Sequence, residues 1–248
     1  MLRKKLIQIL RPLFVLLFWL SIWEAAALLV NNEYFLPGAI TTFKALFAIA
    51  FTKGFLSSIF LTLSRVLLGL FLGVFLGAIL AYICHKIPLI NALFSPLVSV
   101  IKATPVATFI ILLWIYLNAN QLTVLIAFLM VMPIIWQNLK DGLATISTEL
   151  SEAALIFGFS FSRRMRILVI PHLFSYFAPA LITSVGLAWK SEIAAEIIAY
   201  TKNSIGQHIN DNKYFMNTPS MFAWTLVVIV ISIIFERLVR MLLRRIQK

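Results

Sequence analysis

The chain is poor in cysteine, in charge and in catalytic motifs. Its one cysteine among 248 residues, Cys84, excludes a disulfide framework and argues against a cysteine-built zinc site. Only 12% of its residues are charged, about half of the roughly 25% that is usual in soluble domains. No His-Glu-x-x-His or Gly-x-Ser-x-Gly pattern occurs, so the sequence gives little support to an intramembrane enzyme.

Hydrophobic residues make up most of the sequence. They account for 62% of it, and the mean hydropathy is +0.99. A water-soluble globule of this size cannot bury so much apolar surface, so lipid is the expected solvent for much of it. The formal net charge of +12 does not indicate nucleic-acid binding, because the cations flank apolar runs and therefore fit loops on the cytoplasmic side of a membrane.

Six apolar stretches are long enough to cross a bilayer as helices, which takes about 20 residues each. The sequence thus predicts an all-α, polytopic membrane bundle of about six transmembrane helices. The basic start and Ala25-Ala26-Ala27 resemble a signal peptide, but the length of the first run and Trp19 and Trp23 favour a retained span. The predicted spans are about 12–30, 57–84, 90–117, 121–139, 172–200 and 219–237.

The distribution of cations sets the expected orientation. With the N-terminus inside, the outer parts hold only Lys44, Lys53, Lys202 and Lys213. Fourteen cations against these four obey the positive-inside rule and place both termini in the cytoplasm. The cytoplasmic cations are Arg3, Lys4, Lys5, Arg11, Lys86, Lys140, Arg163, Arg164, Arg166, Arg237, Arg240, Arg244, Arg245 and Lys248.

Small residues and a proline mark two of the predicted spans. Gly69, Gly73 and Gly77 recur every four residues, a spacing that lets helices approach closely in lipid, so we expect them to serve helix packing. Pro105 follows Thr104 inside an apolar run and predicts a kink. Backbone carbonyls freed at membrane depth must face protein or a wet cavity.

Ionisable residues within apolar runs are candidates for a solute pathway, because such groups are costly in lipid. Lys102 either faces a pathway or extends to the cytoplasmic edge. Glu192 and Glu196 share one helical face, whereas Lys190 points elsewhere. The alternative for the two glutamates is interhelical ion pairing, with Arg65 as a partner, or proximity to the outer interface.

The segment 140–171, between the fourth and fifth spans, has helical signals of its own. Thr148 is a candidate N-cap, with Glu149 near the first turn, and Gly158 is a natural left-handed terminator, so we expect a helix of about nine residues. Ser160 can cap a second short helix. The first helix either inserts its apolar side chains into a groove of another protein or folds back onto the bundle.

This segment resembles the EAA signature of ABC importer permeases, which is Glu-Ala-Ala, three residues, Gly, nine residues, Ile, any residue, Leu-Pro. The spacing is kept, with Leu168 and Ile170 at the aliphatic positions. The runs 62–69 and 186–189 are similar to the nitrate/sulfonate/taurine branch, although Lys190-Ser191-Glu192 is less apolar than in many members. The ATPase-coupling residues that the resemblance implies are Glu152, Ala153, Ala154, Leu155, Phe157, Gly158 and Pro171.

The resemblance implies a type I importer transmembrane domain at 57–238, with a coupling segment at 148–171. Residues 1–56 would form an N-terminal transmembrane helix and an outer interfacial segment, and 239–248 a basic cytoplasmic tail. The chain would be a multi-pass protein of the bacterial inner membrane. Its implied partners are two cytoplasmic ATPase subunits, a second permease subunit (an identical copy in a homodimer) and an extracytoplasmic solute-binding protein.

Neither an enzymatic activity nor a cofactor is expected of this chain. No Gly-x-x-x-x-Gly-Lys-Ser/Thr loop is present to hold phosphates, so ATP should be bound and hydrolysed by a partner subunit. The expected cargo is a small nitrate-, sulfonate- or taurine-like anion, or alternatively a pyrimidine vitamin precursor. A proton-coupled carrier or channel is the rival class. The candidate pathway residues are Lys102, Thr104, Pro105, Trp189, Lys190, Glu192 and Glu196.

Overall fold

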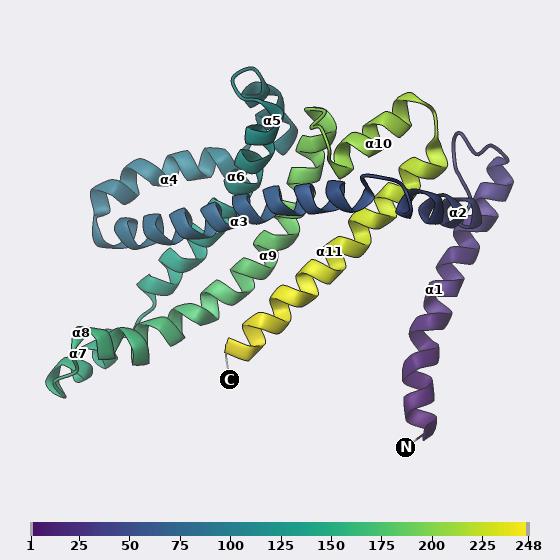
Figure 1. Ribbon diagram of the computed structural model, residues 1–248. Helices are drawn as coiled ribbons and strands as arrows, with labels where there is room; N and C mark the ends of the chain where they lie inside the picture. The colour runs from purple at the N-terminus through teal and green to yellow at the C-terminus, as the bar shows by residue number, and fades with distance from the viewer. Residues whose placement is uncertain (1, 247–248) are drawn as a thin grey trace.

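The computed structural model describes the backbone of residues 2–246 and the side chains of residues 10–246, except that of Ser151. The predicted cytoplasmic Lys248 and the side chains of Arg3, Lys4 and Lys5 therefore lie outside the described part. Every regular element in this part of the chain is helical, as predicted (Figure 1). The elements are α1 (Leu2–Val30), α2 (Ala39–Ala50), α3 (Phe55–Lys86), α4 (Pro88–Ala103), α5 (Val106–Trp114), α6 (Ala119–Ala144), α7 (Thr148–Ile156), α8 (Phe161–Arg164), the π-helix η1 (Met165–Val169), α9 (Ile170–Ile198), α10 (Ile205–Tyr214) and α11 (Thr218–Ile246).

The number of helices suited to crossing a membrane is slightly smaller than the sequence predicts. Among the described residues, four stretches qualify by length and composition, namely Leu10–Val30, Phe55–Lys86, Ala119–Ala144 and Phe161–Ile198. The bent pair α4 and α5 is a fifth if it counts as one span. The sixth predicted span lies within α11, a continuous helix of 29 residues that is not among these five.

The third predicted span is broken rather than kinked. α4 ends at Ala103, α5 begins at Val106, and the two helices meet at 101°. Proline disfavours helical geometry in the residue before it, and Thr104 accordingly has an extended backbone (φ −79°, ψ 129°). Pro105 also lacks the N–H that would continue the helical hydrogen-bond ladder.

The core of the bundle forms where α3, α6 and α9 pack together. Gly69, Gly73 and Gly77 lie on the face of α3 that meets α6, and a Cβ at Gly73 would come 2.6 Å from the Cβ of Val131. Such a gap is well inside van der Waals contact, so only glycine permits this separation of the two helices. Val66 and Ile135 are fully buried beside these glycines.

α1 stands apart from the other helices along most of its length (Figure 1). Its described contacts gather near its C-terminal end, where the Trp23 indole N–H donates to the Pro37 carbonyl at 3.0 Å and the Glu24 carboxylate accepts from the Ile40 N–H at 3.1 Å. The Trp23 ring also lies 6.0 Å from the ring of Phe222 on α11. Most of the apolar surface of α1 is therefore left for lipid or another subunit.

The bundle has two ends. The α7 end holds the C-termini of α3 and α6, the short helices α7 and α8, and the start of α9. The α10 end holds the start of α3, the end of α9 and the polar helix α10 (Figure 1). Candidate functional residues lie at both ends.

Candidate functional site

The helix α7 begins one residue earlier than the sequence indicates. Its N-cap is Ser147, whose hydroxyl accepts from the Leu150 N–H at 3.1 Å, and Thr148 is the first helical residue. Both hydroxyl residues suit a cap, and the sequence alone does not choose between neighbours. The helix is nine residues long, as expected, with Glu149 in the first turn, where a carboxylate interacts favourably with the helix dipole.

Gly158 ends α7 in a left-handed conformation, with φ +69°. The Gly158 N–H donates to the Leu155 carbonyl and the Phe159 N–H donates to the Ala154 carbonyl, both at 2.9 Å. This pair of bonds is a Schellman motif, in which glycine is favoured because a side chain strains the left-handed backbone. Among the described residues, no atom beyond its own chain neighbours lies within 4 Å of where a Cβ of Gly158 would stand, so its requirement for glycine is conformational rather than steric.

The far side of α7 presents an apolar surface to solvent, which we call the α7 tip. The side chains of Leu155, Ile156 and Phe157 are 58%, 84% and 78% exposed. Glu152 is exposed on the same short helix, whereas Ala153 and Ala154 are partly buried. The side chains of Leu155, Ile156 and Phe157 are therefore not packed against the bundle, and another protein can contact them.

The base of this segment is attached firmly to two long helices. His172 on α9 lies 3.1 Å from the Gly142 carbonyl and 3.1 Å from the Thr145 hydroxyl, measured from its Nε2. Thr145 also donates to the Tyr176 hydroxyl at 2.9 Å, and a Cβ at Gly142 would come 2.9 Å from the Tyr176 ring. These contacts join the end of α6 to the first turns of α9, on the two sides of α7 along the chain.

The return from α7 to α9 is continuous but irregular. Ser160 caps α8, as the sequence predicts, with its hydroxyl 3.4 Å from the Arg163 N–H. The π-helix η1 then leads directly into α9, whose first turn contains Pro171. Short π-helical stretches are often found at functional sites, and a proline is well tolerated where no N–H donor is needed.

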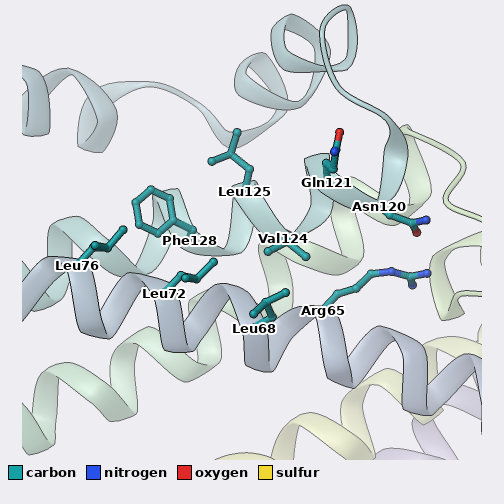
Figure 2. A pocket seen from close by; sticks show the side chains of 9 residues that line it. All are labelled: Arg65, Leu68, Leu72, Leu76, Asn120, Gln121, Val124, Leu125 and Phe128. Carbon is teal, nitrogen blue, oxygen red and sulfur yellow. The ribbon is translucent and has the colours of Figure 1, made fainter.

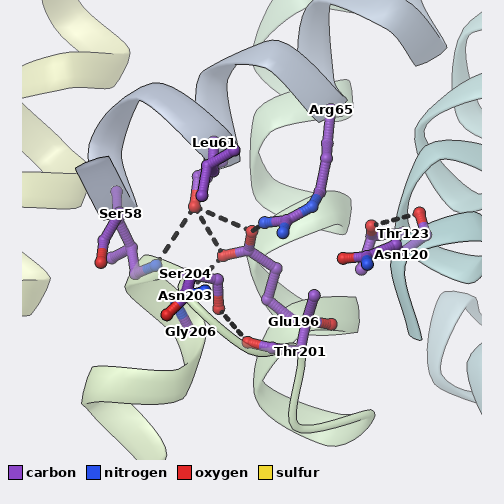
Figure 3. Close-up of polar contacts among 12 residues, drawn as sticks. Ser58, Leu61, Arg65, Asn120, Thr123, Glu196, Thr201, Asn203, Ser204 and Gly206 are labelled. Carbon is purple, nitrogen blue, oxygen red and sulfur yellow. Dashed lines mark hydrogen bonds and ion pairs between the residues drawn. The ribbon is translucent and has the colours of Figure 1, made fainter. Parts of the chain in front are cut away.

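At the α10 end, Glu196 joins three helices through its carboxylate (Figure 3). Thr62 donates to it at 2.8 Å, Arg65 forms an ion pair with it at 3.0 Å, and the Gly206 N–H donates at 3.0 Å. Thr62 in turn accepts from the Ile205 N–H at 3.1 Å. The carboxylate therefore sits at the N-terminus of α10, where backbone N–H groups favour an anion.

Gly206 is required by the close approach of α10 to α9. A Cβ at this position would come 2.3 Å from the Cβ of Glu196 and 2.8 Å from its backbone carbon. The Glu196 side chain is fully buried, and that of Arg65 is 11% exposed. The interhelical ion pair with Arg65 that the sequence allows is thus present in the structure.

Polar groups outside the membrane-spanning helices complete this end. His208 on α10 stacks on the Trp224 ring at 4.4 Å between centroids, and its Nε2 lies 3.0 Å from the Ser58 hydroxyl. Burial lowers the pKa of His208, although the nearby Asp211 acts in the opposite direction. Tyr200 donates its hydroxyl to Asp211, and this hydrogen bond raises the pKa of Tyr200.

The candidate pathway residues do not share one surface. Trp189 and Glu192 are buried in the bundle with Glu196. The Trp189 indole N–H donates to the Val228 carbonyl at 3.2 Å, while neither carboxylate oxygen of Glu192 has a hydrogen-bond partner among the described residues. Lys102 and Lys190 are exposed, as is Pro105; Thr104 is partly buried and its hydroxyl donates to the Val100 carbonyl at 2.8 Å.

A groove of about 560 Å³ runs between α3 and α6, on the side of Arg65 (Figure 2). Asn120 and Gln121 lie with Arg65 at one end of it, and the remainder is lined by apolar side chains such as Leu72 and Phe128. The groove is therefore polar near the α10 end and apolar toward the middle of the bundle.

Comparison with known proteins decides the family. Residues 73–248 match the family described as the binding-protein-dependent transport system inner membrane component. The chain belongs to this family. The permease is thus the membrane component of an ABC transporter and not itself the catalytic subunit.

Individual relatives agree with this assignment. The permease is 22% identical over 229 residues to the taurine transport system permease protein TauC of Escherichia coli strain K12, covering 90% of this chain and 83% of TauC. It is 23% identical over 156 residues to SsuC of Bacillus subtilis strain 168, a permease protein named for aliphatic sulfonates transport, covering 62% of this chain and 56% of SsuC.

A solved structure has the same fold. The permease matches a crystal structure of an amino acid ABC transporter with histidines at a TM-score of 0.64 and 20% identity, covering 81% of this chain and 97% of that one. An identity this low shows the fold alone.

Sequence reasoning gave no role to three residues that the structure places at contacts between helices. Thr62 lies three positions before Arg65, so their shared helical face was a usable signal. Gly206 follows the cap Ser204, but nothing in the sequence indicates that α10 would point at Glu196. Glu236 on α11 lies against Gly186, where a Cβ would come 2.8 Å from its carboxylate oxygen, and an acidic residue so far inside a helix of 29 residues was itself a signal.

Proposed function

We propose that this permease is the membrane subunit of an ATP-driven importer, and that α7 is the helix through which a separate ATPase moves it. The observation that carries the proposal is the α7 tip: a nine-residue helix, closed by Gly158, exposes Leu155, Ile156 and Phe157, and it connects α6 to α9, whose adjoining ends are hydrogen-bonded to each other. Apolar side chains on a rigid short helix suit a cleft in a partner protein.

The proposed topology has six spans with both termini in the cytoplasm. α11 is the sixth span, since 29 residues at 1.5 Å each reach about 43 Å, more than a hydrocarbon core of about 30 Å. The α7 end is then cytoplasmic, where Lys86, Arg163 and Arg166 gather. The α10 end faces outward, toward the solute-binding protein.

Two copies of the chain, two ATPase subunits and a binding protein make up the proposed transporter. The cargo is a small sulfonate, with taurine as the first compound to test, because TauC matches most of this chain. Other nitrate- or sulfonate-like anions come next, and a pyrimidine vitamin precursor is the alternative. Lys102 and Lys190 are exposed and suit an anion, so Lys102→Ala and Lys190→Ala should lower its uptake if they line the pathway.

The test is uptake by proteoliposomes that contain the permease together with its ATPase and its binding protein. Uptake should require ATP and both partners. Transport by the permease alone, driven by a proton gradient, would instead identify a secondary carrier.

Coupling is tested with Gly158→Asp and Glu152→Gln in the same proteoliposomes. Each should leave membrane insertion intact while ATP hydrolysis no longer produces uptake. Glu149→Gln is the matched control, because it removes the same charge from the same helix outside the motif. Normal uptake by Gly158→Asp would contradict the role of α7.

A further inference from the structure

A second cavity lies at the α7 end, on the other side of the coupling segment's base. It measures about 520 Å³ and is walled by the C-terminal turns of α3, the end of α6 and the segment from Ile146 to Leu173. It is separate from the groove beside Arg65, since the two share no lining residue. Neither the family nor the relatives assign it a ligand.

The rim of this cavity is cationic. Lys86 contributes from the last turn of α3, next to His85, and Arg164 contributes from α8. No aspartate or glutamate lines the cavity, and within residues 10–246 neither Lys86 nor Arg164 forms an ion pair. An anion entering here would meet two unneutralised cations from two different elements.

The interior of the cavity is apolar. Ala78 and Leu143 lie deeper along α3 and α6, and Val169 and Leu173 close the opposite wall. Lys86 ends a 32-residue apolar helix, so the rim stands at the level where the membrane meets water. A free inorganic anion would use the rim and gain nothing from these walls, whereas an acyl chain would bury its own apolar surface against them.

We propose that this cavity binds an anionic phospholipid, with the phosphate between Lys86 and Arg164 and an acyl chain along Ala78 and Leu143. Basic pockets between transmembrane helices commonly hold acidic lipid headgroups. The lipid would connect α3 to α8 and η1, which otherwise belong to different parts of the bundle. It would thereby steady the base of the coupling segment against the transmembrane helices.

The test measures lipid retained by the full-length permease, purified in detergent and analysed by native mass spectrometry. With phosphatidylglycerol added, one lipid per chain should remain bound at concentrations where phosphatidylcholine does not. Each cation near a membrane surface contributes about 1 kcal/mol, so the double variant Lys86→Gln/Arg164→Gln should retain phosphatidylglycerol roughly 10- to 30-fold more weakly. Equal retention of both lipids by the parent would overturn the proposal.

Two further variants separate the cavity from general surface charge. Arg237→Gln/Arg245→Gln removes two exposed cations from α11, outside the cavity, and should keep parental retention. Ala144→Phe fills the cavity from an exposed position and keeps every charge, so it should reduce retention without disturbing the core. Parental retention by Ala144→Phe, or equal losses in both double variants, would show that the lipid binds elsewhere.

Competition with soluble glycerol phosphate distinguishes the two sources of a phosphate group. A lipid site should release phosphatidylglycerol only weakly, because glycerol phosphate lacks the acyl chains that the apolar walls contact. Complete displacement at equal concentration would identify a site for free phosphate esters and overturn the lipid assignment.

Discussion

Glu196 joins three helices at the α10 end through one carboxylate. It accepts from Thr62 and Gly206 and pairs with Arg65, so α3, α9 and α10 all depend on it. A charge removed from water is tolerated when its partners are in place, and losing one partner leaves the other charge uncompensated.

We expect Glu196→Gln to lower the free energy of unfolding by about 2 to 4 kcal/mol, because Arg65 would keep its buried charge without a counterion. The measurement is the thermal unfolding midpoint in detergent. Glu33→Gln is the control, since Glu33 lies exposed near the same end and, within the described part of the chain, its side chain accepts only from Thr41. Adding Arg65→Gln to Glu196→Gln should recover part of the loss, and full additivity of the two changes would contradict a direct ion pair.

His208 makes the α10 end sensitive to pH. Burial against Trp224 lowers its pKa in the folded state, whereas the unfolded chain should titrate near the ordinary value of about 6.5. The unfolded state therefore binds the proton more readily, and stability falls as the pH drops below about 6.5.

The loss of thermal stability between pH 7.5 and pH 5.5 should thus be smaller in His208→Gln than in the parent. Identical profiles of thermal stability against pH for His208→Gln and the parent would show that protonation of His208 does not affect the stability of the fold.

For single residues, the sequence showed which ones were unusual but not which of them would contact one another. Arg65 and Glu196 stood out as ionisable residues in apolar runs. Their pairing was one of the two alternatives to a role in a solute pathway. Gly206 could not be predicted, because its role depends on the direction in which α10 leaves α9. That direction is set by the left-handed backbone at Tyr200 and Asn203 (φ 51° and 53°), which neither residue type requires.

Among the elements, the contact between α3 and α6 is limited by side-chain size at three successive glycines, Gly69, Gly73 and Gly77. Gly73 stands where its Cβ would overlap Val131, which is itself fully buried. Neither helix can move away from the other without disturbing the core that both share with α9.

We expect Gly73→Ala to lower the free energy of unfolding by about 1 to 3 kcal/mol, the usual cost of overpacking a core. Thermal unfolding in detergent measures the change. Ser64→Ala on the same helix is the control, because Ser64 is exposed. A variant Gly73→Ala as stable as the parent would mean that α3 and α6 are more loosely packed than the structure shows.

Element boundaries followed the sequence wherever a local signal was strong. Ser160 marks a start and Gly158 an end as predicted, because capping and left-handed termination depend on a single residue and its neighbours. The break at Pro105 was stronger than a kink. A proline shows that the helical ladder is interrupted, but the 101° angle between α4 and α5 depends on what each half packs against.

For the whole molecule, the number of membrane spans determines on which side of the membrane each terminus lies. Six spans place both termini on one side of the membrane, and five place them on opposite sides. The α7 tip and the α10 end lie at opposite ends of the bundle (Figure 1).

Cysteine labelling in intact cells tests the proposed topology. Phe215→Cys, an 82% exposed position following α10, should react with an impermeant maleimide, and Ile156→Cys should react only after the cells are opened. The natural Cys84 is buried and gives little background. A fluorescent protein fused to the C-terminus should mature and fluoresce, because six spans place the C-terminus in the cytoplasm. A fusion that does not fluoresce would contradict six spans, as would labelling of Ile156→Cys in intact cells.

The most direct test of the account is photo-cross-linking from the α7 tip in an assembled transporter that is competent for uptake. A photoreactive maleimide on Ile156→Cys should join the permease to the ATPase subunit with high yield, whereas the same probe on Phe215→Cys should not. Absence of ATPase product from position 156 in complexes that still transport would contradict the claim that α7 carries the ATPase's motion into the membrane.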